Sequence, residues 1–393
     1  MNTVGERIPV AAVLALGLTQ IIAYGTLYYS FSILAPDMAR DLGWSTEWVF
    51  GALSAALLAG GFAAPWFGRL IDRHGAGRMM SAGSLLAAAA LAACAAAPNG
   101  AVFVAALIAL ELASNLVQYG AAFALLVQLQ PHVAARSITY LTLIGGFAST
   151  VFWPITSALH RQLSWQEVYL VFAALNLVVC LPLHGWLSAG LARSRAAMST
   201  APVPVLGRLP EGGRRSGFAL MVAGFALQSL VGAAILVHMV PLLSGLGLGA
   251  SAAFIGTLFG PSQVVSRLIN MGFGRNLSPV VLAVIAATLM PLGVLVLALT
   301  APSVAGAMAF AILFGLGNGL LSIVSGTLPL HLFGSEGYGR LQGRVNSARL
   351  VVSAVAPFAL AFGMIRIGVI PSLAVAVAAG AIAVLAFLMI RRG

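Results

Sequence analysis

Arg267 is a permanently charged residue in a stretch that is otherwise small and apolar, FGPSQVVSRLINMGFG, and that contains no acid. Gln263 precedes it by four residues and Asn270 follows it by three, so the three side chains share one face of a helix. A guanidinium offers a planar fork of donors that fits a carboxylate. Because an unpaired charge is costly in an apolar environment, the pattern predicts that an anion binds here.

Arg349 is the second arginine inside an apolar stretch, NSARLVVSAVAPF, where it shares a predicted helical face with Asn346 and Ser353. The two guanidiniums can converge on one anion if their helices are neighbours. Two alternatives stay open. Water and helix carbonyls can satisfy both arginines, or Arg349 can extend to the cytoplasmic interface.

Glu111 is the only acid well inside an apolar stretch of the chain. Asn115 and Gln118 follow it at steps of four and three, which places the three side chains on one helical face with Tyr119 beside them. Embedded acids usually face a cavity. Glu111 is therefore a candidate for proton coupling or for the counter-charge of one arginine, and the alternative is a neutral acid held by hydrogen bonds.

Further polar residues recur in other apolar stretches. Gln20, Tyr24 and Tyr28 are four residues apart and form one stripe of candidate substrate contacts, although aromatic residues near span ends also serve as interface anchors. His238 is a candidate substrate contact or an ordinary packed histidine. Asn318 lies in FGLGNGLLS, where the glycines indicate close helix packing and the asparagine is expected to face inward.

The elements that carry these residues must be membrane-spanning helices. The chain has 393 residues, of which 61% are hydrophobic and 7% are charged, whereas about a quarter of the residues of a soluble domain are charged. A spanning segment must satisfy its own backbone hydrogen bonds, which favours helices. We identify twelve apolar stretches of sufficient length: 9–35, 47–70, 78–97, 101–127, 137–159, 167–190, 217–243, 251–274, 279–300, 303–332, 342–365 and 371–390.

The distribution of arginines orients these spans, since cytoplasmic loops carry an excess of basic residues. With the N-terminus in the cytoplasm, the outer side receives Arg40, Arg161 and Arg366. The inner side receives Arg7, Arg69, Arg73, Arg78, Arg136, Arg193, Arg195, Arg208, Arg214, Arg215, Arg275, Arg340, Arg344, Arg391 and Arg392. Both termini are therefore expected in the cytoplasm.

A polar stretch divides the chain into two halves. LARSRAAMSTAPVPVLGRLPEGGRRS is rich in Pro, Gly, Ser and Arg, and predicts a cytoplasmic linker over 193–215 between six-helix bundles at 1–192 and 216–393. The halves resemble each other where DLGWSTEWVFGAL and GLGLGASAAFIGTL open the second and eighth spans. Transporters built from duplicated bundles show such internal repeats.

The turn after the second span, GRLIDRHGAGR, resembles the signature loop of the major facilitator superfamily, Gly-x-Leu-x-Asp-Arg-x-Gly followed by basic residues. The matching residues are Gly68, Leu70, Asp72, Arg73 and Gly75, with Arg78 one place beyond the usual basic positions. The resemblance implies an all-α membrane protein of twelve helices in two six-helix bundles, with spans one, four, seven and ten lining a cavity. It also implies that this loop braces the closed inner gate. Physically, Gly68 allows close helix approach, and Asp72 can accept from Arg73 or Arg78 or cap a facing helix.

Three features look like the monocarboxylate and oxalate–formate exchanger branch of that superfamily: GGFASTVFWP in span five, VPLLSGLGLGASAA before span eight, and Arg267 itself. The branch carries an embedded arginine in span eight. Its oxalate–formate members have a lysine in span eleven, where this chain has Arg349. Monocarboxylate carriers commonly have an aspartate one turn before the span-eight arginine, where this chain has Gln263.

Other classes of function lack their signatures. The sequence contains no nucleotide-binding loop, zinc-ligand spacing or Gly-x-Ser-x-Gly elbow, and its six histidines are scattered. Cys94 and Cys180 lie in apolar runs and predict no disulfide framework. The net charge of +11 is not organised as a basic cluster interleaved with aromatics. We expect no enzyme, metal, cofactor or nucleic-acid partner.

The expected function is secondary transport of a small organic anion, a mono- or dicarboxylate, by an exchanger or proton symporter. The expected protein is a monomer in the lipid of a bacterial cytoplasmic membrane. The alternative is a drug or siderophore carrier, which would favour a wide, aromatic-lined cavity and would not need two embedded arginines. A membrane-embedded sensor or enzyme would need a signalling domain or a catalytic constellation, which the sequence does not contain.

Overall fold

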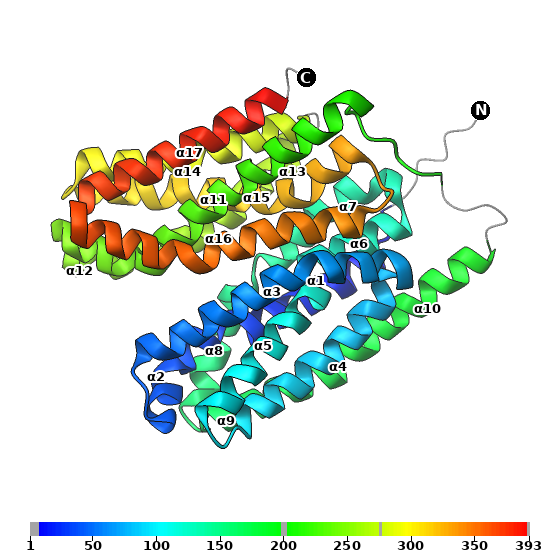
Figure 1. Ribbon diagram of the computed structural model, residues 1–393, viewed down its shortest axis with the longest axis horizontal. Coiled ribbons are helices and arrows are strands. Elements are labelled where there is room, and N and C mark those ends of the chain that lie inside the picture. Colours follow the sequence, from blue (N-terminus) through cyan, green and yellow to red (C-terminus); the bar gives the residue numbers. More distant parts are fainter. Residues whose placement is uncertain (1–7, 198–202, 275–276, 391–393) are drawn as a thin grey trace. The chain divides into compact units, whose positions relative to one another are not determined.

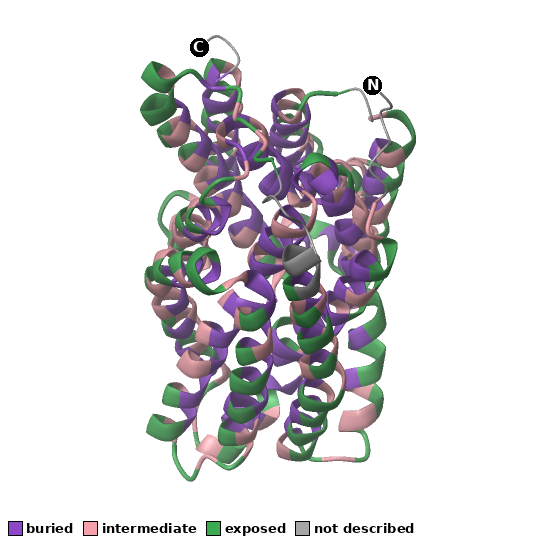
Figure 2. Cartoon of the chain, turned by 90° about the vertical axis from the view of Figure 1, so that its right-hand side faces the viewer, coloured by how far each residue is buried: buried purple, intermediate pink, exposed green. Residues whose placement is uncertain are grey.

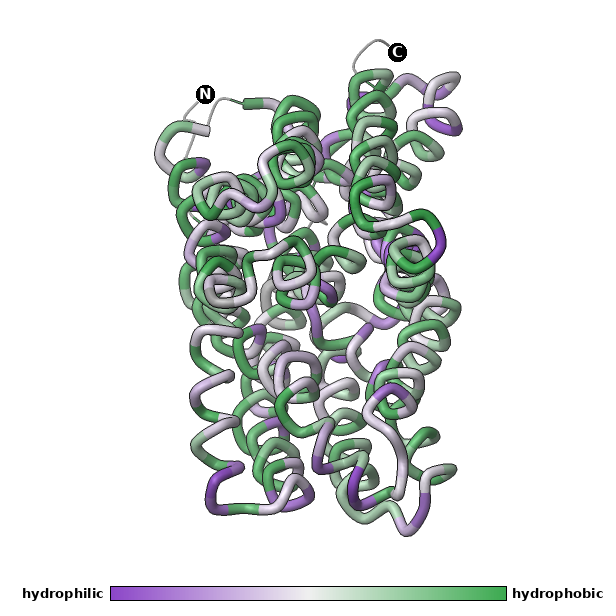
Figure 3. The backbone as a smooth tube through the Cα atoms, turned by 90° about the vertical axis from the view of Figure 1, so that its left-hand side faces the viewer, coloured by the Kyte–Doolittle hydropathy of each residue, from purple (hydrophilic) through white to green (hydrophobic). Residues whose placement is uncertain are grey.

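The protein is an all-α, multi-pass membrane protein. The computed structural model describes residues 8–197, 203–274 and 277–390, and this part of the chain contains no β-strand. Eleven of its helices are long and apolar enough to cross a membrane. Figure 3 shows hydrophobic residues along most of each helix and strongly hydrophilic residues mainly in the turns. Arg7, Arg275, Arg391 and Arg392, which the topology assigned to the inner side, lie outside the described residues.

The first six spans follow the expected order, and several are built from more than one helical segment (Figure 1). They comprise α1 (Val10–Tyr24), a π-helical turn η1 (Gly25–Tyr29), α2 (Phe31–Leu42), α3 (Thr46–His74), α4 (Ala76–Ala95), α5 (Gly100–Val117), α6 (Tyr119–Leu129), η2 (Pro131–Val133), α7 (Ala134–Gly145), α8 (Ala148–His160), α9 (Trp165–Leu175), η3 (Asn176–Cys180) and α10 (Leu181–Ala197).

The remaining spans follow the part of the linker that the structure describes. In that part, Leu206 forms a single antiparallel β-bridge with Gly334. They comprise η4 (Glu211–Gly213), α11 (Arg214–Leu243), η5 (Ser244–Leu248), α12 (Gly249–Thr257), α13 (Phe259–Phe273), α14 (Pro279–Thr300), α15 (Val304–Phe333), α16 (Tyr338–Ile367) and α17 (Val369–Ile390).

The eighth expected span, 251–274, is not among the eleven helices that are long and apolar enough to cross a membrane. It is divided into α12 and α13 at Leu258. Pro261 has no backbone N–H, so the carbonyl of Thr257 cannot receive its usual bond from four residues ahead. Arg267 therefore lies in α13, a short helix that follows a break.

By residue contacts the chain forms two compact units. Unit 1 extends to Leu206 and also includes Gly334–Ser347, whereas unit 2 comprises Gly207–Phe333 and the chain from Ala348 onward. Helix α16 thus begins in unit 1 and continues in unit 2. The domain boundaries expected from the sequence, 1–192, 193–215 and 216–393, stay a prediction.

Each unit has a core of closely packed helices. In unit 1, α4 packs against α5, α9 and α10, and in unit 2, α14 packs between α15 and α17 (Figure 1). Buried and exposed residues alternate along the individual helices in Figure 2, as expected for helices with one face toward protein and one toward lipid. The exposed residues include large apolar side chains such as Phe62, Phe358 and Ile365, which suit a lipid environment.

The fourth span is interrupted at Gln118, where the backbone is extended. The N–H groups of Ala121 and Ala122 both bond to the carbonyl of Gln118, so the carbonyl of Val117 lacks the donor that a continuous helix would provide. The side-chain amide of Gln20, on α1, donates to that carbonyl at 2.7 Å. The interruption also ends the single helical face that the sequence predicted for Glu111, Asn115 and Gln118.

Gln20→Leu should destabilise unit 1 because it leaves the Val117 carbonyl buried without its donor, at a cost of about 1–3 kcal/mol. The measurement is the thermal unfolding of purified protein in detergent. Thr139→Val is a matched control, since the Thr139 hydroxyl donates within its own helix, to Ala135 at 3.1 Å. An unfolding temperature of Gln20→Leu equal to that of the control would contradict this assignment.

Candidate functional site

Arg267 is buried within unit 2, with 4% of its surface exposed. Its Nε group donates to the carbonyl of Gly319 at 3.3 Å and to the hydroxyl of Ser322 at 3.1 Å, both on α15. Its Nη2 group donates to the side-chain oxygen of Gln263 at 3.5 Å, one turn earlier on α13. The guanidinium therefore leaves its own helix and is held mainly by the backbone and hydroxyl of α15.

The contacts of Arg267 are neutral and incomplete. Its Nη1 group is buried without a hydrogen-bond partner, and none of the ion pairs found among the described residues involves this guanidinium. A buried charge without an acid retains most of its desolvation penalty. Among the described residues, the Nη1 side is thus where the guanidinium lacks both an acceptor and a counter-charge.

Close packing of α13 on α15 makes the contact with the Gly319 carbonyl possible. A Cβ atom at Gly319 would lie 2.5 Å from the carbonyl oxygen of Gln263 and 2.8 Å from its Cα atom. One turn earlier, a Cβ atom at Gly315 would lie 2.6 Å from the carbonyl oxygen of Phe259. Glycines spaced by four residues thus let the two backbones touch, in the manner of membrane Gly-x-x-x-Gly contacts.

Gln263 and Asn318 extend this contact. The side-chain amide of Asn318 donates to the Gln263 oxygen at 3.0 Å, so that oxygen receives donors from both α13 and α15. Asn270, predicted to share the face of Arg267, points differently. A Cβ atom at Gly274 would overlap its Oδ1 atom, so the Asn270 amide is directed toward the end of α13 while the guanidinium extends toward Gln263.

Arg349 is half-buried on α16, in the part of that helix that belongs to unit 2. Its Nε group donates to the hydroxyl of Ser229, on α11, at 3.2 Å. Arg267 and Arg349 thus contact different helices, α15 and α11. Their convergence on one substrate stays a prediction.

Glu111 is buried on α5, with 5% of its surface exposed. It lies where α5 meets α3, and a Cβ atom at Gly60 would be 3.4 Å from the Glu111 Cβ. Among the described residues its carboxylate takes part in none of the hydrogen bonds or ion pairs found. The described residues therefore supply none of the hydrogen bonds expected for a purely structural neutral acid.

Asn115 and Gln20 direct their side-chain amides at backbone carbonyls. Asn115 donates to Gly60 at 3.2 Å and to Glu111 at 3.1 Å, and Gln20 donates to Val117. His238 is also engaged, since its Nε2 atom lies 2.9 Å from the carbonyl oxygen of Pro357. These contacts give the three residues a role in holding helices together.

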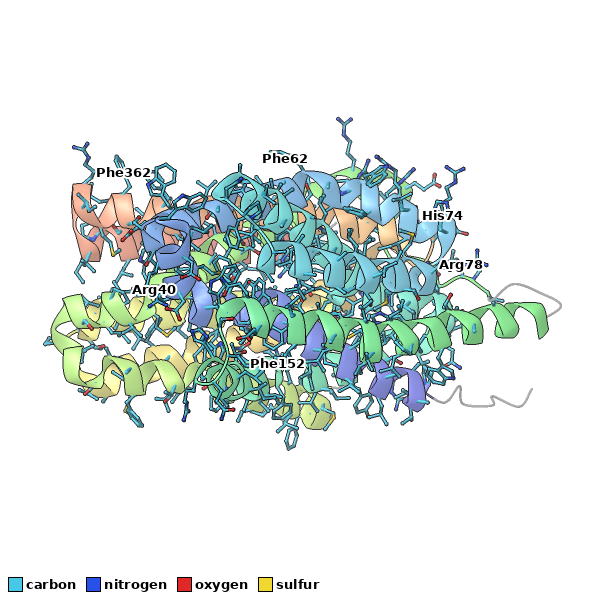
Figure 4. The ribbon with its side chains drawn as sticks, turned by 90° about the horizontal axis from the view of Figure 1, so that it is seen from below. Arg40, Phe62, His74, Arg78, Phe152 and Phe362 are labelled. Atoms are coloured by element: carbon cyan, nitrogen blue, oxygen red, sulfur yellow. The ribbon has the colours of Figure 1, made fainter. Side chains whose placement is uncertain are left out.

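Aromatic side chains gather on the first span and its neighbours. The rings of Tyr24 and Tyr119 are 4.8 Å apart, and Tyr119 stacks on Phe123 at 5.2 Å. The π-helical turn η1 presents Tyr29 to Trp153 of α8, with ring centres 6.1 Å apart. Phe152, labelled in Figure 4, packs over Gly25 at the start of that turn, where a Cβ atom would overlap its ring.

The motif turn contacts the beginning of α16 within unit 1. Asp72 accepts hydrogen bonds from the backbone N–H groups of Gly339 at 2.8 Å and Arg340 at 2.7 Å, and so caps the first turn of α16 with a negative charge. Of the partners the sequence left open for Asp72, a facing helix is the one observed. A Cβ atom at Gly68 would overlap the Gly339 carbonyl, and one at Gly343 would lie 2.5 Å from the carbonyl of Ala64.

Gly75 has a φ of +89° between α3 and α4, which glycine adopts without strain. The side chain of Gln128 holds this turn, since it accepts from the N–H of Ala76 at 2.9 Å and donates to Ile71 at 3.3 Å. Arg73 and Arg78 are exposed. Figure 4 shows His74 and Arg78 at one end of unit 1 and Arg40 toward the other.

Ser322, Gly319 and Ser229 contact the embedded arginines but were not identified from the sequence. Ser322 follows Asn318 by four residues, so helical spacing from Asn318 could have indicated it. Ser229 carries no comparable signal, because its contact with Arg349 depends on how α11 packs against α16. No group of His, Cys, Asp and Glu suited to a metal occurs among the described residues.

Comparisons with known proteins agree with this fold. The model of the Major Facilitator Superfamily matches residues 16–357, and no curated protein matches the chain. The structure is similar to that of the human organic anion transporter MFSD10 (TETRAN), with a TM-score of 0.70 and 16% identity over 98% of each chain.

Two other solved structures show the same architecture. The proton:xylose symporter XylE, bound to 6-bromo-6-deoxy-D-glucose, has a TM-score of 0.72 and 12% identity, covering 96% of this chain and 94% of that one. FucP in the outward conformation has a TM-score of 0.68 and 12% identity, covering 98% and 99%. At these identities the likenesses concern the fold alone.

Asp72→Asn should slow transport and leave substrate affinity nearly unchanged, because the side chain contacts the start of α16 and weakens as a cap when its charge is removed. The measurement is the maximal rate and KM of uptake into proteoliposomes. Glu47→Gln, at the other end of α3, is the matched carboxylate-to-amide control. A large rise in KM at a normal maximal rate would contradict this role.

Proposed function

Because the chain belongs to the major facilitator superfamily, whose members are membrane transporters, we propose that it is a secondary transporter of a small organic anion, a mono- or dicarboxylate. The observation that carries this proposal is the Arg267 guanidinium, which is buried and finds neither an acid nor a partner for Nη1 among the described residues. A substrate carboxylate would supply the missing charge and the missing acceptors together.

The neutral partners of Arg267 support an anion over a neutral substrate. A sugar hydroxyl would satisfy a donor but would leave the buried charge uncompensated. MFSD10 is described as an organic anion transporter and XylE as a proton:xylose symporter, so relatives of this fold do not choose between anions and sugars. The choice rests on the charge of Arg267.

The other parts of the proposal come from the sequence analysis. The substrate contacts are Arg267, Arg349, Gln263, Asn115, Tyr119, Tyr24, Gln20, His238 and Asn318. The protein is proposed to be a monomer in the bacterial cytoplasmic membrane, with both termini in the cytoplasm, and to work by alternating access. Transport is driven by exchange or by proton symport through Glu111. The turn that contains Asp72 biases the conformational equilibrium and does not contact substrate.

The discriminating experiment is thermal stabilisation of the purified protein by formate, oxalate, lactate and benzoate, against tetraphenylphosphonium as a lipophilic cation. The proposal expects stabilisation by at least one of the four carboxylates. Stabilisation only by the cation would favour a drug carrier and overturn the anion assignment.

Arg267→Gln should abolish stabilisation by the carboxylates, since it removes the charge and keeps a polar side chain of moderate size. Gln263→Glu should weaken carboxylate binding at least tenfold, equivalent to about 1.4 kcal/mol. Its carboxylate would replace an oxygen that lies 3.5 Å from Nη2 and would become the internal counter-charge of Arg267. Binding is measured by thermal-shift titration at neutral pH.

Ser262→Ala serves as the control for both variants, because the Ser262 hydroxyl lies on the same helix and donates to the carbonyl of Leu258 at 2.7 Å. Wild-type affinity in Arg267→Gln, in a protein that remains folded, would remove the basis of the anion site.

Glu111→Gln should abolish accumulation driven by a pH gradient and leave downhill exchange measurable, if Glu111 carries the coupling proton. Its burial and its lack of a hydrogen-bonded acid or base partner among the described residues motivate this expectation. Uptake into proteoliposomes with and without an imposed pH gradient measures it. An unchanged response to the gradient would assign Glu111 a structural role.

A further inference from the structure

The planar guanidinium of Arg267 has two edges at which a carboxylate can be held by parallel N–H groups. The side edge consists of Nε–H and one N–H of Nη2. The end edge consists of the other N–H of Nη2 and one N–H of Nη1. Protein acceptors occupy the Nε–H of the side edge, which donates to Gly319 and Ser322, and Nη2 makes a long contact of 3.5 Å with Gln263. The end edge contains the buried Nη1 group without a partner.

Ser322 is oriented to hold the side edge. Its hydroxyl proton is directed at the carbonyl of Gly319, at 2.7 Å, so the oxygen lone pairs remain for the Nε–H of Arg267 at 3.1 Å. Ser322 thus acts as an acceptor whose own rotation is fixed by a second hydrogen bond. The contact with Gln263, at 3.5 Å, is the weakest of the three.

The backbone on which Ser322 stands is also fixed. Gly319 packs directly against Gln263 of α13. Gly317 packs against α14, where a Cβ atom would lie 2.7 Å from Met290 Cγ and 2.9 Å from the carbonyl oxygen of Ala286. Helix α15 is therefore packed closely against both α13 and α14, which restricts its movement toward or away from either.

Building on the proposed function, we propose that Ser322, with the Gly319 carbonyl, is a positioning residue that fixes the side edge of Arg267, so that a substrate carboxylate binds end-on through Nη1 and Nη2. Arg267 then holds one carboxylate, and the second carboxylate of a dicarboxylate must find its donors elsewhere. Ser322 itself does not contact the substrate, and it acts by restricting the guanidinium to one orientation before binding.

The test compares Ser322→Ala, Ser322→Cys and Ser322→Thr with the wild type. The probe is whichever of formate, oxalate, lactate and benzoate stabilises the wild-type protein most. Ser322→Ala and Ser322→Cys should raise its KM about tenfold with a maximal transport rate within about twofold of wild type, since each loses the hydroxyl acceptor. Ser322→Thr should restore the wild-type KM. Thr327→Ala is the control, because the buried Thr327 hydroxyl donates within α15, to Ile323 at 3.0 Å.

The outcomes separate this inference from the proposed function. If none of the four carboxylates binds, or if Arg267→Gln binds them normally, the proposed function fails and this inference fails with it. If Arg267→Gln loses binding while Ser322→Ala and Ser322→Cys keep the wild-type KM, only the role of Ser322 is overturned. A raised KM that Ser322→Thr shares, or that Thr327→Ala reproduces, also overturns it, because the hydroxyl would not be the cause.

Discussion

The interior of a membrane offers no water to polar groups, so every donor and acceptor within the spans must find its partner in the chain. This constraint explains where the amides of the interior are directed. Gln20 donates to the Val117 carbonyl beside the break at Gln118, and Gln228 donates to the Ala287 carbonyl at 3.0 Å. Polar side chains here mainly complete the hydrogen bonding of helices.

Small residues make these contacts possible, since a hydrogen bond between helices requires their backbones to approach closely. Gly319 brings α15 onto α13 and thereby brings a carbonyl to the guanidinium of Arg267. Gly68 similarly brings α3 onto the start of α16, where Asp72 reaches two backbone N–H groups. A glycine with no chemistry of its own thus positions each charged residue.

Arg267 has a buried polar atom without a partner among the described residues, as Gln20 and Gln228 have in their amide oxygens, but of these three only Arg267 carries a charge. Its side edge follows the constraint, because protein oxygens accept from it, whereas its Nη1 group remains buried without a partner. Folding alone would favour an acid nearby or an apolar residue in its place. A site that keeps an uncompensated charge is suited to a ligand that brings the opposite charge.

The sequence determined the features that depend on composition and on spacing within one helix: the all-α membrane fold, the spans, and the embedded Arg267 and Glu111. Tertiary structure decided which groups these residues meet. The acceptors of Arg267 come from a helix some fifty residues later, where Ser322 lies. The break at Gln118 is stabilised by Gln20, about a hundred residues earlier. Periodicity assigns a residue to a face of its own helix, but the partner on that face depends on the packing of distant segments, which spacing within one helix does not record.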